Sequence, residues 1–261
     1  MTYALLCLTV FLLTYMLNAF YISVLYHRGL THGAVELHPF TRKFVVATGN
    51  WVTGIDPKGW SAMHRLHHAA SDTEADPHSP RFHNVFALML VQLHSYNRML
   101  SKLIRRAPET MRTVKDLDFE VSWLNRRGLW ALPYLLHASV GVVLGLTVGW
   151  WLGAAYFFGM MTHPIQGWLV NAFAHKYGGR NFETPDDSRN NGLVAWLVFG
   201  EGYQNNHHHS PRSANFAMRG HEVDLGYGMC LAAQKLGMLR VVPVPAEVAV
   251  PPETPHVMLR S

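Results

Sequence analysis

The sequence predicts an all-α integral membrane protein, with about three transmembrane helices, further interfacial helices and a histidine-rich helical cap on the cytoplasmic side. Charged residues make up only 15% of the chain, against about 25% in typical soluble domains. Long apolar segments contain no charge at all, which indicates that they lie in lipid. The third observation is that the basic residues avoid these segments. It indicates which side of the membrane the polar segments face.

Lysine and arginine are absent from residues 1–26 and 128–175, and all 22 of them lie in the rest of the chain. This positive-inside pattern places both basic segments in the cytoplasm. We expect the bacterial inner membrane, with the endoplasmic reticulum as the alternative. Because the basic residues follow membrane topology rather than one molecular face, the sequence argues against binding of nucleic acid. Cys7 and Cys230 are the two cysteines, and they predict neither a disulfide framework nor a cysteine-rich zinc site.

Residues 3–26 carry no charge and predict the first transmembrane helix. At about 1.5 Å per residue, a helix of this length crosses a hydrocarbon core of about 30 Å. A signal peptide is the competing interpretation, but it requires a basic start and a cleavage site, whereas this segment leads directly into His27 and Arg28. Residues 40–55 are too short to span and predict a buried or interfacial helix.

Residues 129–151 and 152–173 predict two further transmembrane helices, joined by a tight outer turn around residues 149–153. The tryptophans in that turn are typical of the far membrane interface. His137 and His163 fall inside these helices, too deep to reach a cytoplasmic site. We therefore expect both to form hydrogen bonds between helices.

Three clusters of histidine indicate a metal site. His64, His67 and His68 have the spacing i, i+3, i+4, which directs all three rings to one face of a helix. The other two clusters are His27 with His32, and the segment Gln204-Asn-Asn-His207-His208-His209. Imidazole is the commonest protein ligand for iron, zinc and copper, so three clusters in one chain favour metal binding over solvated surface histidines.

His27 and His32 are five residues apart, about 140° around an ideal helix, and so do not share a face of one regular helix. We expect the backbone to leave the helix at Gly29, which would bring both rings to one metal region. The loop of residues 69–80 contains Asp72, Glu74, Asp76 and His78. Capping or ion pairing with arginine is the favoured role for these side chains, ahead of metal binding.

Eight imidazoles are predicted to converge on the cytoplasmic side: His27, His32, His64, His67, His68, His175, His207 and His208. They exceed the four ligands of structural zinc and the six of one octahedral ion, so two metal ions are the simplest way to occupy them. Asn171 precedes His175 by four residues, a spacing that places both side chains on one face of a helix, where they can act at one site. No nucleophile motif or phosphate loop is visible, which favours attack on a lipid chain. Breaking an unactivated C–H bond requires a strong oxidant, which iron with O2 supplies.

Four motifs carry a family resemblance: His27-Arg-x-x-x-His32, His64-Arg-x-His-His68, Asn171-x-x-x-His175 and Gly-Glu-Gly-x-x-Asn-x-His207-His208. Together they resemble the membrane fatty acid desaturase family, and most closely its acyl-CoA (delta-9 or stearoyl-CoA) branch, from about Tyr26 to Leu239. The resemblance implies two irons bound by nine histidines, with Asn171 acting through a water molecule. It also implies O2 as co-substrate and two electrons from a separate ferredoxin or cytochrome b5 type donor with its reductase. The product would be a cis double bond in an acyl-CoA or acyl-lipid substrate.

The chain departs from this family pattern in two places. The third histidine box of the family usually begins with histidine, where this chain has Gln204. We favour Gln204 as the replacement, either as a weak ligand through its carbonyl oxygen or as a hydrogen-bonding group beside the site. His209 is the alternative, but on a helix it would point about 100° away from His208. The second departure is a single helix before the first box, where the stearoyl type has a pair.

We expect one desaturase-like membrane domain over residues 1–241, followed by a proline-rich, disordered tail over residues 242–261. The predicted function is O2-dependent desaturation of a fatty acyl chain at a di-iron centre. A lipid or alkane hydroxylase on the same scaffold is an alternative, because the same oxidant can return oxygen to the carbon. A non-catalytic zinc-binding membrane receptor is an alternative of another class, and it predicts one zinc per chain instead of two irons.

Overall fold

Helices form most of the part of the chain that the computed structural model describes, residues 2–244, as the sequence predicts. In chain order the elements are α1 (Tyr3–Ala19), the π-helix η1 (Phe20–Thr31), β1 (Val35–Leu37), α2 (Pro39–Thr53), α3 (Pro57–Ala70), α4 (Leu88–Ile104), α5 (Pro108–Thr113), α6 (Trp123–Arg126), α7 (Leu132–Thr147), α8 (Trp150–Met160), α9 (His163–Trp168), the π-helix η2 (Leu169–Phe173), α10 (Gly192–Leu197), α11 (Gln204–His209), α12 (Leu225–Lys235) and β2 (Leu239–Val241). The domain limit at residue 241 stays a prediction. The predicted tail, residues 242–261, lies outside the described residues beyond Val244.

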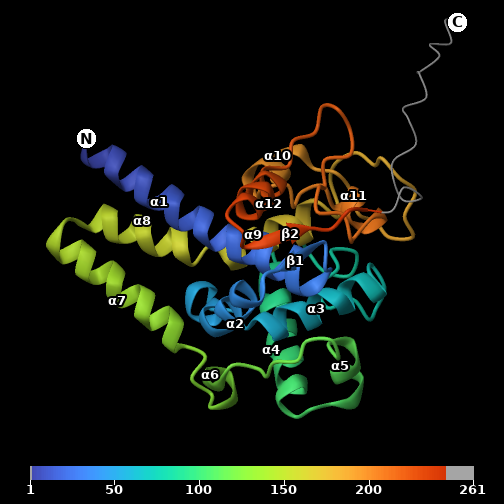
Figure 1. The fold of residues 1–261 in the computed structure, drawn as a ribbon, viewed down its shortest axis with the longest axis horizontal. Helices are drawn as coiled ribbons and strands as arrows, with labels where there is room; N and C mark the ends of the chain where they lie inside the picture. Colours follow the sequence, from blue (N-terminus) through green and yellow to red (C-terminus); the bar gives the residue numbers. More distant parts are fainter. Residues whose placement is uncertain (1, 245–261) are drawn as a thin grey trace, which may run out of the picture.

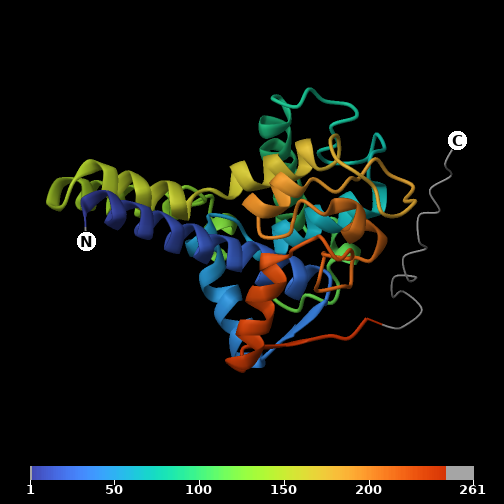
Figure 2. The ribbon, with the colours of Figure 1, turned by 90° about the horizontal axis from the view of Figure 1, so that it is seen from above.

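The helices α1, α7 and α8 form a long arm that projects from a wider head (Figure 1, Figure 2). α8 packs against both α1 and α7, so the apolar hairpin predicted from residues 129–173 is present. Small residues permit close contact: a Cβ atom on Gly153 of α8 would lie 2.1 Å from the carbonyl oxygen of Gly141 in α7. Large apolar side chains such as Leu13 and Trp151 are exposed on the arm. Close helix contacts and an apolar outer surface are typical of helices in lipid.

Among the described residues, one helical stretch is long and apolar enough to cross a membrane, Tyr3–Thr31, whereas the apolar helix α7 is shorter. The prediction of a single helix over residues 152–173 is wrong, because α8 ends at Met160 and α9 begins at His163. Pro164 lies in the first turn of α9, where the missing N–H of proline does not interrupt a helix. The break falls where the arm meets the head.

The helix α1 continues directly into η1, a π-helix in which backbone hydrogen bonds join residues five apart. One such bond runs from the N–H of His32 to the carbonyl oxygen of His27 (3.1 Å). The prediction that the chain leaves the helix at Gly29 is therefore wrong. The turn of a π-helix is wider than that of an α-helix, so residues five apart come onto nearly the same face. The rings of His27 and His32 accordingly lie 4.9 Å apart, centroid to centroid.

The head surrounds η1 with segments from distant parts of the sequence. α2 and α3 pack on η1, and so does α12 from the C-terminal part of the chain (Figure 1). The largest apolar core includes Val24 and Tyr26 of η1 and Trp60 of α3. β1 pairs antiparallel with β2, which places Val35 opposite Val241 and fastens the later segments to the region just after η1. The end of η1, which carries the first pair of histidines, is therefore enclosed from several sides.

Candidate metal centre

Histidines from four separate segments form two adjoining groups in the head. In each group, one ligand atom of every member lies within 4.8 Å of the ligand atoms of the others. The first group contains His27, His32, His64, His68 and His207, and the second contains His67, His175 and His208. The eight predicted imidazoles thus divide into five and three. The groups are in contact, since the ring centroids of His68 and His208 lie 4.4 Å apart.

Helix α3 contributes to both groups. Asp56 caps the start of this helix by accepting hydrogen bonds from two backbone N–H groups in its first turn (3.0 and 2.9 Å). His64 and His68 are one turn apart and belong to the first group, whereas His67 belongs to the second. The helix therefore forms a wall that the two groups share.

The ring nitrogens of the first group point at one another. His27 Nε2 lies 3.0 Å from His207 Nε2, and His68 Nε2 lies 3.0 Å from His64 Nε2 and 2.9 Å from His207 Nε2. Neutral imidazoles at this spacing either donate a hydrogen bond from one ring to the next or share a cation through their lone pairs. The donor set therefore fits a metal ion.

Four of the histidines have a carboxylate on the ring nitrogen that faces away from the groups. The pairs are His27 Nδ1 with Glu201 Oε2 (2.7 Å), His67 Nδ1 with Asp76 Oδ2 (3.0 Å), His175 Nδ1 with Asp72 Oδ2 (3.3 Å) and His208 Nδ1 with Asp186 Oδ2 (2.7 Å). An Nδ1–H that donates to a carboxylate leaves the Nε2 lone pair available for a metal. In keeping with this, Nε2 of His67 and of His208 is buried without a hydrogen-bond partner within residues 2–244. Orphaned buried acceptors of this kind also fit metal ligation.

Asp72 and Asp76 have a role beyond the predicted one. Each carboxylate accepts a hydrogen bond from a histidine of the second group, which the sequence did not predict. Each also accepts from backbone N–H groups, as the predicted capping role requires, whereas neither pairs with an arginine side chain among the described residues. Glu74, which lies between them, is exposed. The available signal was their position: both follow the histidines of α3 closely, in a loop short enough to fold back on that helix.

Burial keeps several imidazoles of the centre neutral. It lowers the pKa of His64, His68 and His207 well below the ordinary value. Burial also lowers the pKa of His208, to about 4, although the hydrogen bond with Asp186 acts in the opposite direction. At neutral pH these rings keep the lone pairs that a metal ion requires.

Glu201 is held in place by a tight backbone corner and a buried arginine. Its Oε1 accepts a hydrogen bond from Arg28 (2.7 Å), and the fully buried Arg28 also donates to Asp224 (2.9 Å). Gly200 has a φ of +89°, and a Cβ atom there would lie 2.1 Å from Asp224 Oδ1. Glycine is therefore required next to Glu201, and the corner directs the carboxylate toward the first group.

Gln204 and His209 are the two candidate replacements for the missing histidine, and they differ in position relative to the histidine groups. Gln204 is buried at the second group, with its Oε1 3.4 Å from His175 Nε2. His209 belongs to neither group, and its ring stacks on Phe182 with 3.9 Å between the centroids. The expectation that His209 points away from His208 agrees with this placement.

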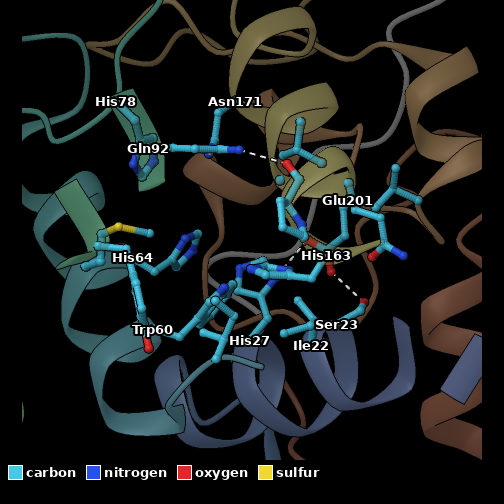
Figure 3. A pocket seen from close by; sticks show the side chains of 18 of the residues that line it. Ile22, Ser23, His27, Trp60, His64, His78, Gln92, His163, Asn171 and Glu201 are labelled. Carbon is cyan, nitrogen blue, oxygen red and sulfur yellow. Dashed lines mark hydrogen bonds and ion pairs between the residues drawn. The ribbon is translucent and has the colours of Figure 1, made fainter. Parts of the chain in front are cut away.

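A largely apolar pocket adjoins the histidine groups (Figure 3). His27 and His64 of the first group line it, and further walls come from α4, α9 and η2. Asn171 of η2 also lines the pocket and donates a hydrogen bond to Gln92 Oε1 of α4 (3.2 Å). A ligand in this pocket would lie directly against the first group.

Two histidines that the sequence did not assign to the site also line this pocket. His78 is buried, and neither of its ring nitrogens has a hydrogen-bond partner among the described residues. The same holds for Nδ1 of His163, so the predicted hydrogen bond between helices is wrong for His163, whose helix turns it toward the pocket. His137, in contrast, bonds to Tyr156 Oη (2.7 Å) and to the carbonyl oxygen of Trp51 (2.9 Å), which joins three helices as predicted.

Comparison with known proteins adds independent information. A family model described as fatty acid desaturase matches residues 2–219. A hex-5-enoyl-acyl carrier protein acetylenase of Moorena producens is 30% identical over 239 residues, which cover 85% of this chain and 72% of the relative. An acyl-CoA 5-desaturase of Anemone leveillei is 30% identical, with 85% and 67% covered, and an sn-1 stearoyl-lipid 9-desaturase of Anabaena variabilis is 30% identical, with 83% and 76% covered. The names of these relatives give three different acyl carriers.

Proposed function

The chain belongs to the fatty acid desaturase family and is an oxidoreductase of fatty acyl chains, and we propose that it uses two iron ions and O2 to form a cis double bond in a long acyl chain. The carrier is proposed to be CoA or a lipid. The observation that carries the proposal is the division of eight imidazoles into two adjoining groups with inward-directed nitrogens. Two groups call for two ions, as in the family that the motifs resemble.

The first iron is proposed to take the five histidines of the first group and the second iron the three of the second group. The second group offers fewer imidazoles, and we propose that Gln204 adds its carbonyl oxygen as a ligand; the 3.4 Å between that oxygen and His175 Nε2 supports this role. Asn171 is proposed to act on the second iron through a water molecule. The donor set is rich in nitrogen and free of cysteine, which suits iron.

Bound iron with O2 supplies the oxidising power that removal of hydrogen from unactivated methylene groups requires. The protein supplies the position of the substrate. Apolar pocket residues such as Ile22, Met63 and Val170 hold the acyl chain beside the first group and exclude water. The carboxylates behind the histidines keep the protons on Nδ1 and fix the orientation of each ring.

The arm is proposed to form three membrane spans, with α1 as the first and α7 and α8 as the second and third. Support comes from the exposed apolar side chains of the arm and from the absence of lysine and arginine in residues 1–26 and 128–175. The head would then lie on the cytoplasmic side. There a separate electron donor, of the ferredoxin or cytochrome b5 type, would deliver two electrons.

The test compares His208→Ala with the neighbouring change His209→Ala in a desaturase-deficient host. His208 belongs to the second group, whereas His209 belongs to neither group. We expect His208→Ala to abolish the unsaturated product and to lower the iron content below two per chain, and His209→Ala to preserve both. Iron is measured on anaerobically purified protein and acyl products by mass spectrometry.

Full activity of His208→Ala would contradict the proposal, and so would one zinc per chain in place of two irons. A product that gains an oxygen atom, instead of losing two hydrogens, would identify the hydroxylase alternative.

A further inference from the structure

His163 and His78 differ from the other polar residues of the pocket wall in having ring nitrogens that are unpaired within residues 2–244, and of the two only His163 lies outside every group of potential metal ligands found there. Its Nδ1 is buried without a hydrogen-bond partner in the described part of the chain, and its side chain lines the pocket (Figure 3). Polar neighbours in the wall are occupied: Gln166 donates to Thr162 Oγ1 (2.6 Å), and Gln92 donates to the carbonyl oxygen of Pro164 (2.8 Å). Leaving a polar atom buried and unpaired costs free energy. His163 therefore fits a pocket occupant that carries a hydrogen-bonding group.

The position of His163 coincides with the junction between arm and head. α8 ends at Met160, just before His163. The end of α1 lies at the same level, because Asn18 Nδ2 donates to the carbonyl oxygen of Met160 (2.7 Å). Ala19, which follows Asn18, lines the same pocket. The pocket thus reaches the level at which the arm helices enter the head.

The outer surface beside His163 is apolar. Ile165 is 48% exposed, and Phe86 and Leu90 near the start of α4 are 76% and 71% exposed. Trp168 Nε1 donates to the backbone carbonyl oxygen just before Phe86 (2.7 Å), which fastens α9 to this part of the chain. Exposed apolar surface next to membrane helices is expected to contact lipid. This end of the pocket would then lie near the boundary between acyl chains and headgroups.

We propose that His163 donates a hydrogen bond to the carbonyl oxygen of an acyl chain that is esterified in a membrane lipid. This inference rests on the proposed function. The acyl carbonyl is the polar atom that every acyl substrate carries next to its hydrocarbon chain, and a neutral imidazole has an N–H for it. Thioesters of CoA or acyl carrier protein have the same carbonyl. Their carriers are hydrophilic and stay in water, whereas the ester carbonyls of glycerolipids lie at the boundary near which the apolar outer surface would place His163.

The test uses the iron-loaded protein in vesicles, with electrons supplied by a reduced ferredoxin, and three saturated substrates of equal chain length. These are a diacyl phosphatidylglycerol, its diether analogue, which lacks the carbonyl, and an acyl-CoA. We expect the wild type to use the ester lipid about tenfold better than the ether lipid in kcat/KM, the contribution of one hydrogen bond. His163→Leu should bring this ratio close to one, and His163→Gln, which keeps an N–H donor, should retain part of it.

His137→Leu is the matched control, because the ring of His137 is satisfied by Tyr156 and Trp51 away from the pocket, and its ester-to-ether ratio should stay at the wild-type value. The iron content of His163→Leu should equal that of the wild type, which separates loss of a substrate contact from loss of fold. An unchanged ratio in His163→Leu would overturn the role of His163. Preferred use of acyl-CoA would overturn the lipid assignment and leave the desaturase proposal intact, whereas no product from any substrate would overturn both.

Discussion

Asp186→Asn is expected to weaken metal binding at the second histidine group and to spare the first. Asp186 Oδ2 accepts a hydrogen bond from His208 Nδ1 (2.7 Å), and Oδ1 accepts from the N–H of Ser188 (3.1 Å) and the hydroxyl of Thr184 (2.9 Å). A backbone N–H cannot act as an acceptor. An asparagine must therefore turn its carbonyl oxygen toward Ser188, and its NH2 group then faces His208.

This change places the proton of His208 on the wrong nitrogen. Opposite an NH2 donor, Nδ1 must become the acceptor, and the proton moves to Nε2, the atom proposed to bind the metal. Loss of a carboxylate behind a metal-binding histidine typically costs about 10- to 100-fold in affinity, which corresponds to about 1.4–2.7 kcal/mol. We expect the upper end of this range for Asp186→Asn, because the ligand atom itself is blocked.

Anaerobic titration of the metal-free protein with Co²⁺, followed by absorption spectroscopy and metal analysis, measures both sites. The wild type should bind two ions tightly and Asp186→Asn one. Asp187→Asn is the control, because the adjacent side chain of Asp187 is exposed and pairs with Arg81 (3.5 Å). Two tightly bound ions in Asp186→Asn would refute the assignment of His208 to a metal and the argument about its proton.

Glu201→Gln is the complementary change, and in the same titration it should weaken binding at the first group by about 10- to 100-fold and spare the second. Gln204→His supplies the histidine that the family usually has, so it should raise the metal affinity of the second group. An unaltered affinity would argue against Gln204 as a ligand of that metal ion. The metal-free protein should lose stability as the pH falls from 6.5 to about 4, because burial lowers the pKa of His208 from 6.5 to about 4 and the unfolded chain then binds the proton first. Protonation of His208 alone should lower the free energy of unfolding by about 3 kcal/mol over this pH range. An apparent Tm of chelator-treated protein that does not fall between pH 7 and pH 5 would contradict this reasoning.

The histidines of α3 show how far local spacing can predict a site. The spacing of His64, His67 and His68 correctly indicates that their rings lie near one another, since this depends only on the geometry of one helix. It does not indicate that His67 belongs to a different group from the other two. That division depends on where His175 and the segment after α10 approach the helix, which is a property of the tertiary fold.

Other features have no local signal. A π-helix is not marked by any residue type, so the shared face of His27 and His32 could not be predicted from their spacing. The carboxylate partners are equally hidden, because Glu201 is far from His27 in the sequence and meets it through the packing of the head around η1. The sequence predicts a continuous helix through His163, and the break before this residue redirects its ring to the pocket.

The histidine–carboxylate pairs couple the metal centre to the stability of the whole head. In the first group, ring nitrogens of His27, His64, His68 and His207 lie about 3 Å apart, close enough for several of them to hold one cation. Metal binding stabilises the folded state by mass action, by about 2.7 kcal/mol at a ligand concentration 100 times Kd. It follows that Glu201→Gln, which weakens binding, should lower the Tm of the metal-loaded protein more than that of the metal-free protein. Equal losses in the two forms would show instead that Glu201 supports the fold independently of the metal.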